Sequence, residues 1–267
     1  LEARRSPQPF QSCNAKPPRG MNQSPWAPPY GQEPARSQTF NLKTVILTWT
    51  ASYFVALFVS SAILVATGNT DIVSGKEPKW FLGVSALALW VPFIIGLYLV
   101  SQKLGSQRFS SDFFLKFRRV DLWGLPIGIA GQLVLVVLVT WPFRVLFPEK
   151  FAPELIEKRA QYLFINATGS WLIVLILVVV IGAPFVEELV YRGFIQSGLK
   201  NRLGSSVAVV ITAVWFAAVH LQLVEFPGLL AFALVLGFCF HRTHRIGMSI
   251  VAHVAFNATG LLLVALL

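Results

Sequence analysis

The sequence predicts an all-α fold, a polytopic transmembrane helix bundle, from three observations. Its 267 residues are 55% hydrophobic and 13% charged, whereas about a quarter of an ordinary soluble domain is charged. Several apolar runs reach the ~18 residues that a transmembrane helix needs. Short polar loops containing Gly, Pro, Asn and Asp separate these runs. Such runs are expected to be helical, because a helix satisfies all of its own backbone polar groups within lipid.

We expect about seven spans, and the pattern also allows six or eight. The expected segments are approximately 44–67, 80–102, 123–147, one from 171, 205–222, 228–240 and 246–267. Two connectors should add short interfacial amphipathic helices. The first, 103–122, places Phe113, Phe114 and Phe117 beside basic residues, which suits the lipid headgroup region. The second covers about 153–165.

The first 40 residues differ in composition from the rest. They hold 8 of the 16 prolines, together with Gln, Ser, Asn and scattered Arg. They bury too little apolar surface to fold, so we expect residues 1–40 to be a disordered tail. Residues 41–267 form the expected transmembrane helical domain, with a catalytic core over 170–260. The chain begins with Leu, and we expect that residue 1 is not the natural start.

Basic residues predict the orientation, because Lys and Arg near span ends favour the cytoplasm. With the N-terminus in the cytoplasm, fifteen Lys and Arg residues flank the cytoplasmic ends and six flank the opposite ends. We therefore expect a multi-pass membrane protein with a cytoplasmic N-terminus. The expected location is a bacterial plasma membrane, with an organelle membrane as the alternative. The lipid bilayer is an expected partner, and a nucleic acid is not.

The cysteine content limits the chemistry. Only Cys13, in the polar tail, and Cys239, in an apolar run, are present. This argues against a disulfide framework and against a metal site built from cysteines. We expect no cofactor, although a zinc ion remains an alternative.

The most informative stretch follows Trp171. An apolar run leads into Pro184 and then into two adjacent carboxylates, Glu187 and Glu188, with Arg192 four residues later. Lipid cannot solvate such charges, so the default expectation is a polar site inside a helix bundle. Glu188 and Arg192 share a helix face and can pair, whereas Glu187 points about 100° away and is left free. Alternatively, both acids lie in water at the end of a span.

Three more polar side chains lie in apolar surroundings. His220 ends one hydrophobic segment, and His253 and Asn257 are four residues apart on one face of the last span. Each has an ordinary alternative, because a single histidine can be a satisfied interior residue and an asparagine often bonds neighbouring helices. Together, however, these groups can avoid lipid by turning toward the two acids and toward water.

A carboxylate, two imidazoles and an amide in one wet pocket would form a hydrolytic set. The carboxylate can take a proton from water, imidazole can orient that water, and an amide N–H can donate to an oxyanion. Depth is a difficulty, because Glu187 lies ~24 Å and His220 ~22 Å along spans that run in opposite directions. The helix with the acids must be tilted, begin further outside, or continue past Arg192, and Pro184 could kink it.

The three motifs, in this order on successive hydrophobic segments, resemble those of the CPBP family. They are Glu-Glu-x-x-x-Arg at 187–192, Phe-x-x-x-His at 216–220 and His-x-x-x-Asn at 253–257, with Tyr-Arg-Gly after the acids. The family comprises CAAX prenyl protease type 2 and bacteriocin-processing proteins, and is also called Abi. The resemblance covers roughly 80–267 and is best over 170–260. It implies an intramembrane glutamic-type endopeptidase.

The resemblance also implies roles by matching position. Glu187 would be the general base, and His220 would hold the attacking water. His253 and Asn257 would form the oxyanion side. The implied partner is a peptide or lipidated peptide, membrane-associated or modified at its C-terminus. The residues that would support the site are Glu188 and Arg192.

Three other functions fit parts of the pattern. A zinc metalloprotease could use one Glu and two His as ligands, although no His-Glu-x-x-His motif is present and the ligands would come from different helices. A membrane scaffold or bacteriocin immunity protein could keep the fold and bind a peptide without cutting it. A proton-coupled transporter would be expected to show two similar halves, and none is evident in the sequence.

Overall fold

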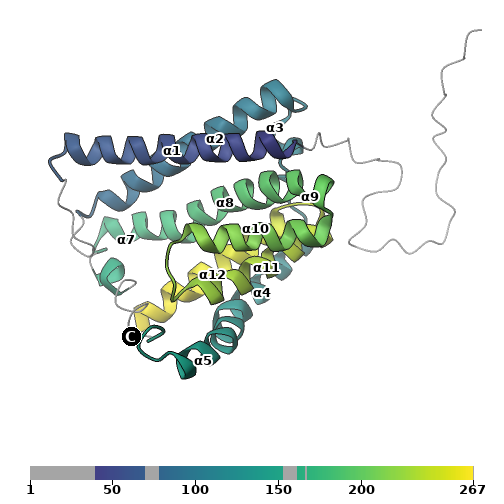
Figure 1. Cartoon of the computed structure of the whole chain (residues 1–267). Coiled ribbons are helices and arrows are strands. Elements are labelled where there is room, and N and C mark those ends of the chain that lie inside the picture. Colours follow the sequence, from purple (N-terminus) through teal and green to yellow (C-terminus); the bar gives the residue numbers. More distant parts are fainter. Residues whose placement is uncertain (1–39, 70–77, 153–160, 166, 267) are drawn as a thin grey trace, which may run out of the picture. The chain divides into compact units, whose positions relative to one another are not determined.

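A computed structural model describes residues 40–69, 78–152, 161–165 and 167–266, and this part of the chain is helical, with no β-strand (Figure 1). Besides six longer apolar stretches, this part of the chain has one apolar helix of 15 residues, Ser205–Val219, which is shorter than a full span. The predicted all-α polytopic bundle is therefore confirmed, with the fifth of the seven expected segments too short to cross a bilayer. Six helical stretches are long and apolar enough to cross a membrane: Leu42–Ala66, Phe81–Leu104, Arg119–Leu146, Ser170–Leu203, Phe226–Thr243 and Gly247–Leu266.

The first two helices, α1 (Leu42–Ala66) and α2 (Phe81–Leu104), pack against each other. The Ser52 hydroxyl of α1 donates to the Pro92 carbonyl of α2 at 3.2 Å. A side-chain carbon added at Gly96 would lie 2.7 Å from the Ser52 oxygen, so glycine permits this close approach. The bounds of both helices lie within two residues of the predicted spans.

The connector 103–122 is not a single interfacial helix. It contains one helical turn, α3 (Phe109–Asp112), then a non-helical stretch, then the 3-10 helix η1 (Arg119–Trp123). Asp112 is buried and accepts hydrogen bonds from the Ser101 hydroxyl at 2.6 Å and from the Ser106 hydroxyl at 2.6 Å. These bonds hold the connector against the end of α2.

The expected headgroup position of the connector phenylalanines is wrong for Phe113. Its side chain is fully buried, with its ring 5.6 Å from the Phe40 ring and 6.0 Å from the Phe194 ring. Phe117, by contrast, is 56% exposed, as an interfacial side chain should be. The connector therefore places one aromatic ring in the core because that ring finds aromatic partners there.

Two sequence predictions fall mostly on residues outside the described part. The expected amphipathic helix over 153–165 is described only at 161–165, which is helical. The expected disordered tail, 1–40, is described only at Phe40. The orientation in the membrane and the identity of the membrane stay predictions.

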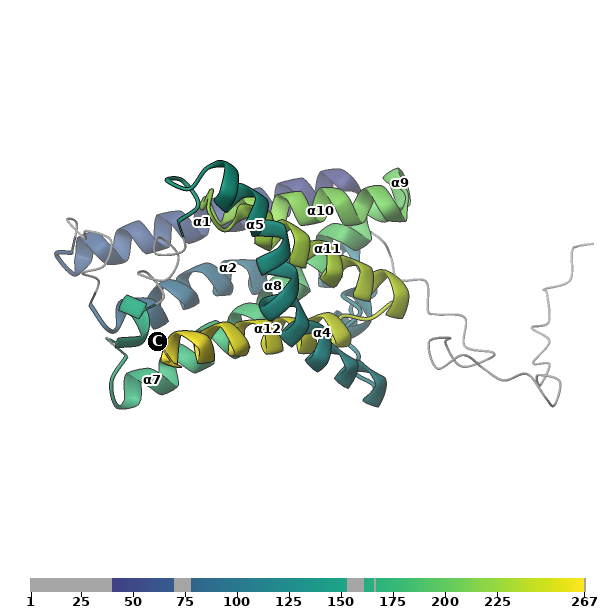
Figure 2. The same ribbon diagram turned by 90° about the horizontal axis from the view of Figure 1, so that it is seen from below.

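The next helical stretch consists of α4 (Gly124–Ala130), the π-helical segment η2 (Gly131–Leu135) and α5 (Val136–Leu146). In both views α4 lies beside the C-terminal helix, α12 (Gly247–Leu266) (Figures 1 and 2).

Glycine is required at the α4–α12 contact. A side-chain carbon at Gly128 would overlap the Ala252 carbonyl oxygen, and one at Gly124 would lie 2.7 Å from the Ala252 nitrogen. The two backbones therefore touch directly. Small residues allow such close helix packing in membranes.

The helix that carries the acids is the longest of the bundle, because five helical segments follow one another without a break for 34 residues. The α-helical segments alternate with two π-helical segments. After the turn at Gly204 the chain runs back as α10 (Ser205–Val219) and then forms α11 (Phe226–Thr243). The five segments are α7 (Ser170–Leu175), η3 (Ile176–Gly182), α8 (Ala183–Glu188), η4 (Leu189–Gln196) and α9 (Ser197–Leu203).

Candidate active site

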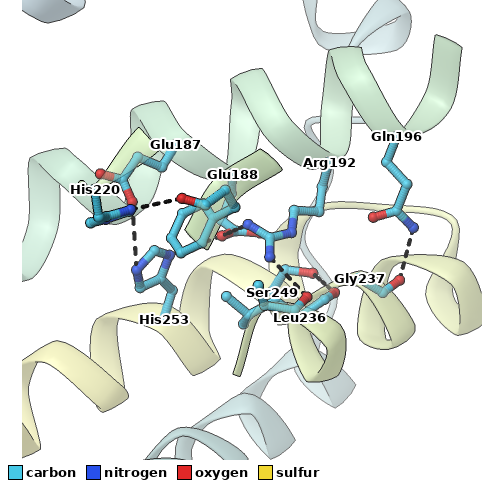
Figure 3. Close-up of polar contacts among 11 residues, drawn as sticks. Glu187, Glu188, Arg192, Gln196, His220, Leu236, Gly237, Ser249 and His253 are labelled. Atoms are coloured by element: carbon cyan, nitrogen blue, oxygen red, sulfur yellow. Dashed lines mark hydrogen bonds and ion pairs between the residues drawn. The ribbon is translucent and has the colours of Figure 1, made fainter. Parts of the chain in front are cut away.

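A row of buried polar side chains runs along the helix that carries the acids. Glu188, Arg192 and Gln196 follow one another at intervals of four residues, and η4 spans the latter two (Figure 3). A π-helical turn is wider than an α-helical turn, so residues four apart stay close to one line. All three are less than 5% exposed, and the row faces α11 and α12.

Glu188 and Arg192 form an ion pair in the centre of the bundle. The Arg192 Nη1 atom lies 2.8 Å from Glu188 Oε1, and both side chains are fully buried. The Nη2 atom of the same guanidinium donates to the Ala233 carbonyl of α11 at 3.0 Å. The guanidinium carbon also lies 5.0 Å from the centre of the Phe216 ring, within the range of a cation–π contact. The charge of Arg192 is therefore compensated from three sides.

His253 of α12 lies between the two acids. Its Nδ1 atom is 2.9 Å from Glu188 Oε1, and because an ionised carboxylate only accepts, Nδ1 carries the proton. Its Nε2 atom faces the other acid and lies 3.7 Å from Glu187 Oε2. The bond to Glu188 thus fixes the imidazole ring and leaves Nε2 directed at Glu187.

Glu187 differs from its neighbour in exposure and in partners. Its side chain is 27% exposed, whereas that of Glu188 is fully buried. The contact with His253 at 3.7 Å is longer than a hydrogen bond. Of the two acids, Glu187 is therefore the one whose carboxylate water or substrate can reach.

His220 stands at the C-terminal end of α10, where its Nδ1 atom lies 2.7 Å from the Phe216 carbonyl. A carbonyl only accepts, so Nδ1 is protonated and Nε2 of the neutral ring is an acceptor. The Phe216 ring lies 4.8 Å from the His220 ring and 5.8 Å from the His253 ring, and so separates the two imidazoles. No hydrogen bond joins His220 to Glu187, although both side chains are at the same end of the polar row (Figure 3).

The length of the acid-bearing helix resolves the difference in depth. The helix continues past Arg192 to Leu203, and the chain turns at Gly204. Counted from this turn, Glu187 lies ~26 Å back along one helix and His220 ~24 Å along the next. The two side chains are therefore level, without a kink being needed to explain it.

Asn257 is close to the site but bonds to backbone. Its Nδ2 atom donates to the Val179 carbonyl of η3 at 2.8 Å. Together with the bond between His253 and Glu188, this gives α12 two polar attachments to the acid-bearing helix. One N–H of the Asn257 amide remains for another acceptor.

Two buried residues near the site were not singled out from the sequence. Gln196 donates from Nε2 to the Gly237 carbonyl at 2.9 Å, and the Ser249 hydroxyl donates to the Leu236 carbonyl at 3.0 Å. Both acceptors belong to α11, which therefore binds the acid-bearing helix on one side and α12 on the other. A signal was available, because Gln196 lies four residues after Arg192 and Ser249 four residues before His253.

The described residues contain no group of three or more His, Cys, Asp and Glu side chains placed to hold a metal ion. Glu188 and His253 bond to each other, and Glu188 also binds Arg192. The zinc alternative is therefore left to experiment.

In a comparison with family models, residues 169–259 match the family described as type II CAAX prenyl endopeptidase Rce1-like. No match was found among curated proteins or among solved structures. The matched segment contains all three motifs and the six residues expected to form the site, and the match confirms the resemblance that the motifs indicated. Residues 169–259 are therefore similar to the type II CAAX prenyl endopeptidases, in agreement with the resemblance to the CPBP family.

Proposed function

We propose that this protein is an intramembrane endopeptidase that hydrolyses peptide bonds with a water molecule activated by Glu187 and His220. One observation carries the proposal. Glu187 is a partly exposed carboxylate 3.7 Å from an imidazole whose other nitrogen is bound to a buried Glu188–Arg192 pair. An acid with spare acceptor capacity beside a fixed imidazole is the arrangement that general-base catalysis needs.

The first step activates water. Glu187 takes one proton from a water molecule that the Nε2 lone pair of His220 helps to orient. The hydroxide oxygen then attacks the carbonyl carbon of the scissile peptide bond, and an electron pair moves onto the carbonyl oxygen. The burial of Glu188 and Arg192 keeps their ion pair from competing for the water.

The second step stabilises and resolves the tetrahedral intermediate. His253 in its doubly protonated form donates to the oxyanion from Nε2, while Nδ1 stays bound to Glu188. The second amide N–H of Asn257 is the other donor that the family resemblance assigns to the oxyanion. The intermediate collapses, the C–N bond breaks, and the leaving amine takes the proton from Glu187. The products are one carboxyl end and one amine end.

The substrate is proposed from the family description rather than from a binding site. The matching family is described as a type II CAAX prenyl endopeptidase, so a membrane-associated peptide modified at its C-terminus is the first substrate to test. The six apolar helical stretches would hold the site within reach of a lipid-anchored peptide.

The test uses the purified protein in liposomes and a fluorogenic peptide that ends in a prenylated cysteine and three further residues. Glu187→Gln and His220→Ala should each lower kcat by roughly 10²–10⁴-fold, the usual contribution of a general base or its partner. Glu149→Gln, at an exposed acid near the end of α5, is the matched control and should cleave like the unchanged protein.

The alternatives predict different outcomes. Loss of activity in chelator and its return with zinc would indicate a metalloprotease. Full activity of Glu187→Gln would disprove the proposed role of this residue. Proteomic comparison of native membranes with and without Glu187→Gln should reveal an uncut precursor, whereas a scaffold or immunity protein would show none.

A further inference from the structure

The backbone hydrogen-bond pattern of the acid-bearing helix has a gap at Val179, where a carbonyl oxygen lacks a backbone N–H donor. In the π-helical segment η3 each carbonyl bonds the N–H five residues later, and the Ala183 N–H accordingly donates to the Val178 carbonyl. The next carbonyl, that of Val179, would accept from residue 184. That residue is Pro184, which has no N–H to donate. The Val179 carbonyl therefore has no partner of this kind within its own helix.

A side chain from another helix fills this gap. Asn257 of α12 donates from Nδ2 to the Val179 carbonyl at 2.8 Å. An unpaired backbone carbonyl is costly in a membrane interior, where no water replaces the lost partner. The asparagine thus does for the π-helical segment what a backbone N–H at residue 184 would otherwise do.

The gap lies close to the proposed general base. Pro184 precedes Glu187 by three residues, less than one helical turn. The segment between Val179 and Glu188 is attached to α12 at both ends, by Asn257 at one end and by His253 at the other. Glu187 lies between these two attachments, so its position relative to His253 depends on both.

We propose that Asn257 is a positioning residue for Glu187, because its amide completes the backbone of the catalytic helix where Pro184 leaves a carbonyl unpaired. This inference rests on the proposed function. It differs from the oxyanion role, since it assigns one Asn257 N–H to the protein's own backbone. The other N–H stays available to substrate.

Substitution at Pro184 separates the two roles. Pro184→Ala restores a backbone N–H that can donate to the Val179 carbonyl without help from α12. If Asn257 positions Glu187, Asn257→Ala should lower kcat by roughly a hundredfold, the usual cost of a misplaced catalytic group, with KM unchanged. The double variant Pro184→Ala/Asn257→Ala should then have a clearly higher kcat than Asn257→Ala, while the part of the loss that comes from the missing oxyanion donor remains.

The contrary result is equally defined. If the double variant is as inactive as Asn257→Ala, the amide acts on the substrate and the positioning role is wrong. The melting temperature in detergent provides a readout independent of activity, and Pro184→Ala should reverse the lowering caused by Asn257→Ala. Should Asn257→Ala fail to fold, recovery of folded protein in the double variant supports the inference and its absence overturns it.

The experiment also keeps this inference separate from the proposed function. A fully active Glu187→Gln variant would disprove the catalytic assignment, whereas the melting temperatures would still report the bond to Val179. Conversely, an inactive Glu187→Gln with no rescue in the double variant would leave the peptidase intact and remove the positioning role.

Discussion

Two buried pairs of a carboxylate and an arginine lie in this bundle, and they are used differently. In the first, Asp121 of η1 accepts from Arg245 Nε at 2.9 Å on Oδ1 and from the Arg118 backbone N–H at 2.7 Å on Oδ2. The Arg245 Nη2 atom lies 2.7 Å from the same Oδ1 as an ion-pair contact. In the second, Glu188 gives the same oxygen to Arg192 and to His253, and its Oε2 has no protein partner.

The two pairs differ in whether an accessible acceptor remains beside them. Asp121 joins a connector to the start of α12 and has donors on both oxygens, so no acceptor remains for a reactant. Around Glu188 the pair is extended through His253 to Glu187, a second acid that is only lightly engaged and 27% exposed. The spare acid, rather than the buried ion pair, marks the site.

The largest expected effect comes from removing the arginine of each pair. Arg192→Met and Arg245→Met each leave a buried carboxylate uncompensated and should each lower the free energy of unfolding by about 3–5 kcal/mol. Only Arg192→Met should also abolish cleavage by the protein that remains folded. Chemical denaturation and kcat per folded molecule measure the two effects. An equal loss of kcat in Arg245→Met would remove the distinction.

A smaller effect is expected when the whole pair at the site is replaced. Glu188→Gln/Arg192→Met removes both charges, so its stability should return to within about 1–2 kcal/mol of the unchanged protein. Its cleavage should not return, because His253 has lost the carboxylate that fixes its ring. The same denaturation and activity assays apply, and recovery of both properties would show that Glu188 is dispensable for catalysis.

The smallest expected effect is at Gln196, which extends the row beyond Arg192. Gln196→Leu removes the bond to the Gly237 carbonyl and should lower the free energy of unfolding by about 1 kcal/mol, with a modest decrease in kcat. Thr212→Val is the matched control, since the Thr212 hydroxyl is buried without a protein partner. A larger loss for Thr212→Val than for Gln196→Leu would contradict this ranking.

Much of the fold could be predicted because the length of each apolar run can be counted in the sequence. Every expected span is helical in the part of the chain that the structure describes. The sequence left open whether the fourth helix continues past Arg192, because Arg192 and the residues after it are polar, and polar residues inside a bundle resemble the end of a span. Phe113 was misplaced because its aromatic partners, Phe40 and Phe194, come from distant positions.

Within the site, the sequence could predict contacts between side chains on one helix, but not contacts between a side chain and the backbone of another helix. Spacing indicated that Glu188 and Arg192 could meet, and the distance of 2.8 Å agrees. The contact of Asn257 with Val179 could not be read from spacing, because it depends on the π-helical segment before Pro184. Contacts to the backbone of α11, such as that of Gln196, depend in the same way on how two helices are placed along their axes. The catalytic roles themselves stay predictions.

The direct contact of α4 with α12 affects whether the segment that matches the family, residues 169–259, could be moved into another protein. Gly124 and Gly128 lie outside residues 169–259, yet they set how closely the helix that bears His253 can approach its neighbour. A graft of residues 169–259 into a foreign host bundle would bring the motifs without the two glycines that let α12 pack closely against α4. A functional transplant has to include the glycine-bearing helix as well.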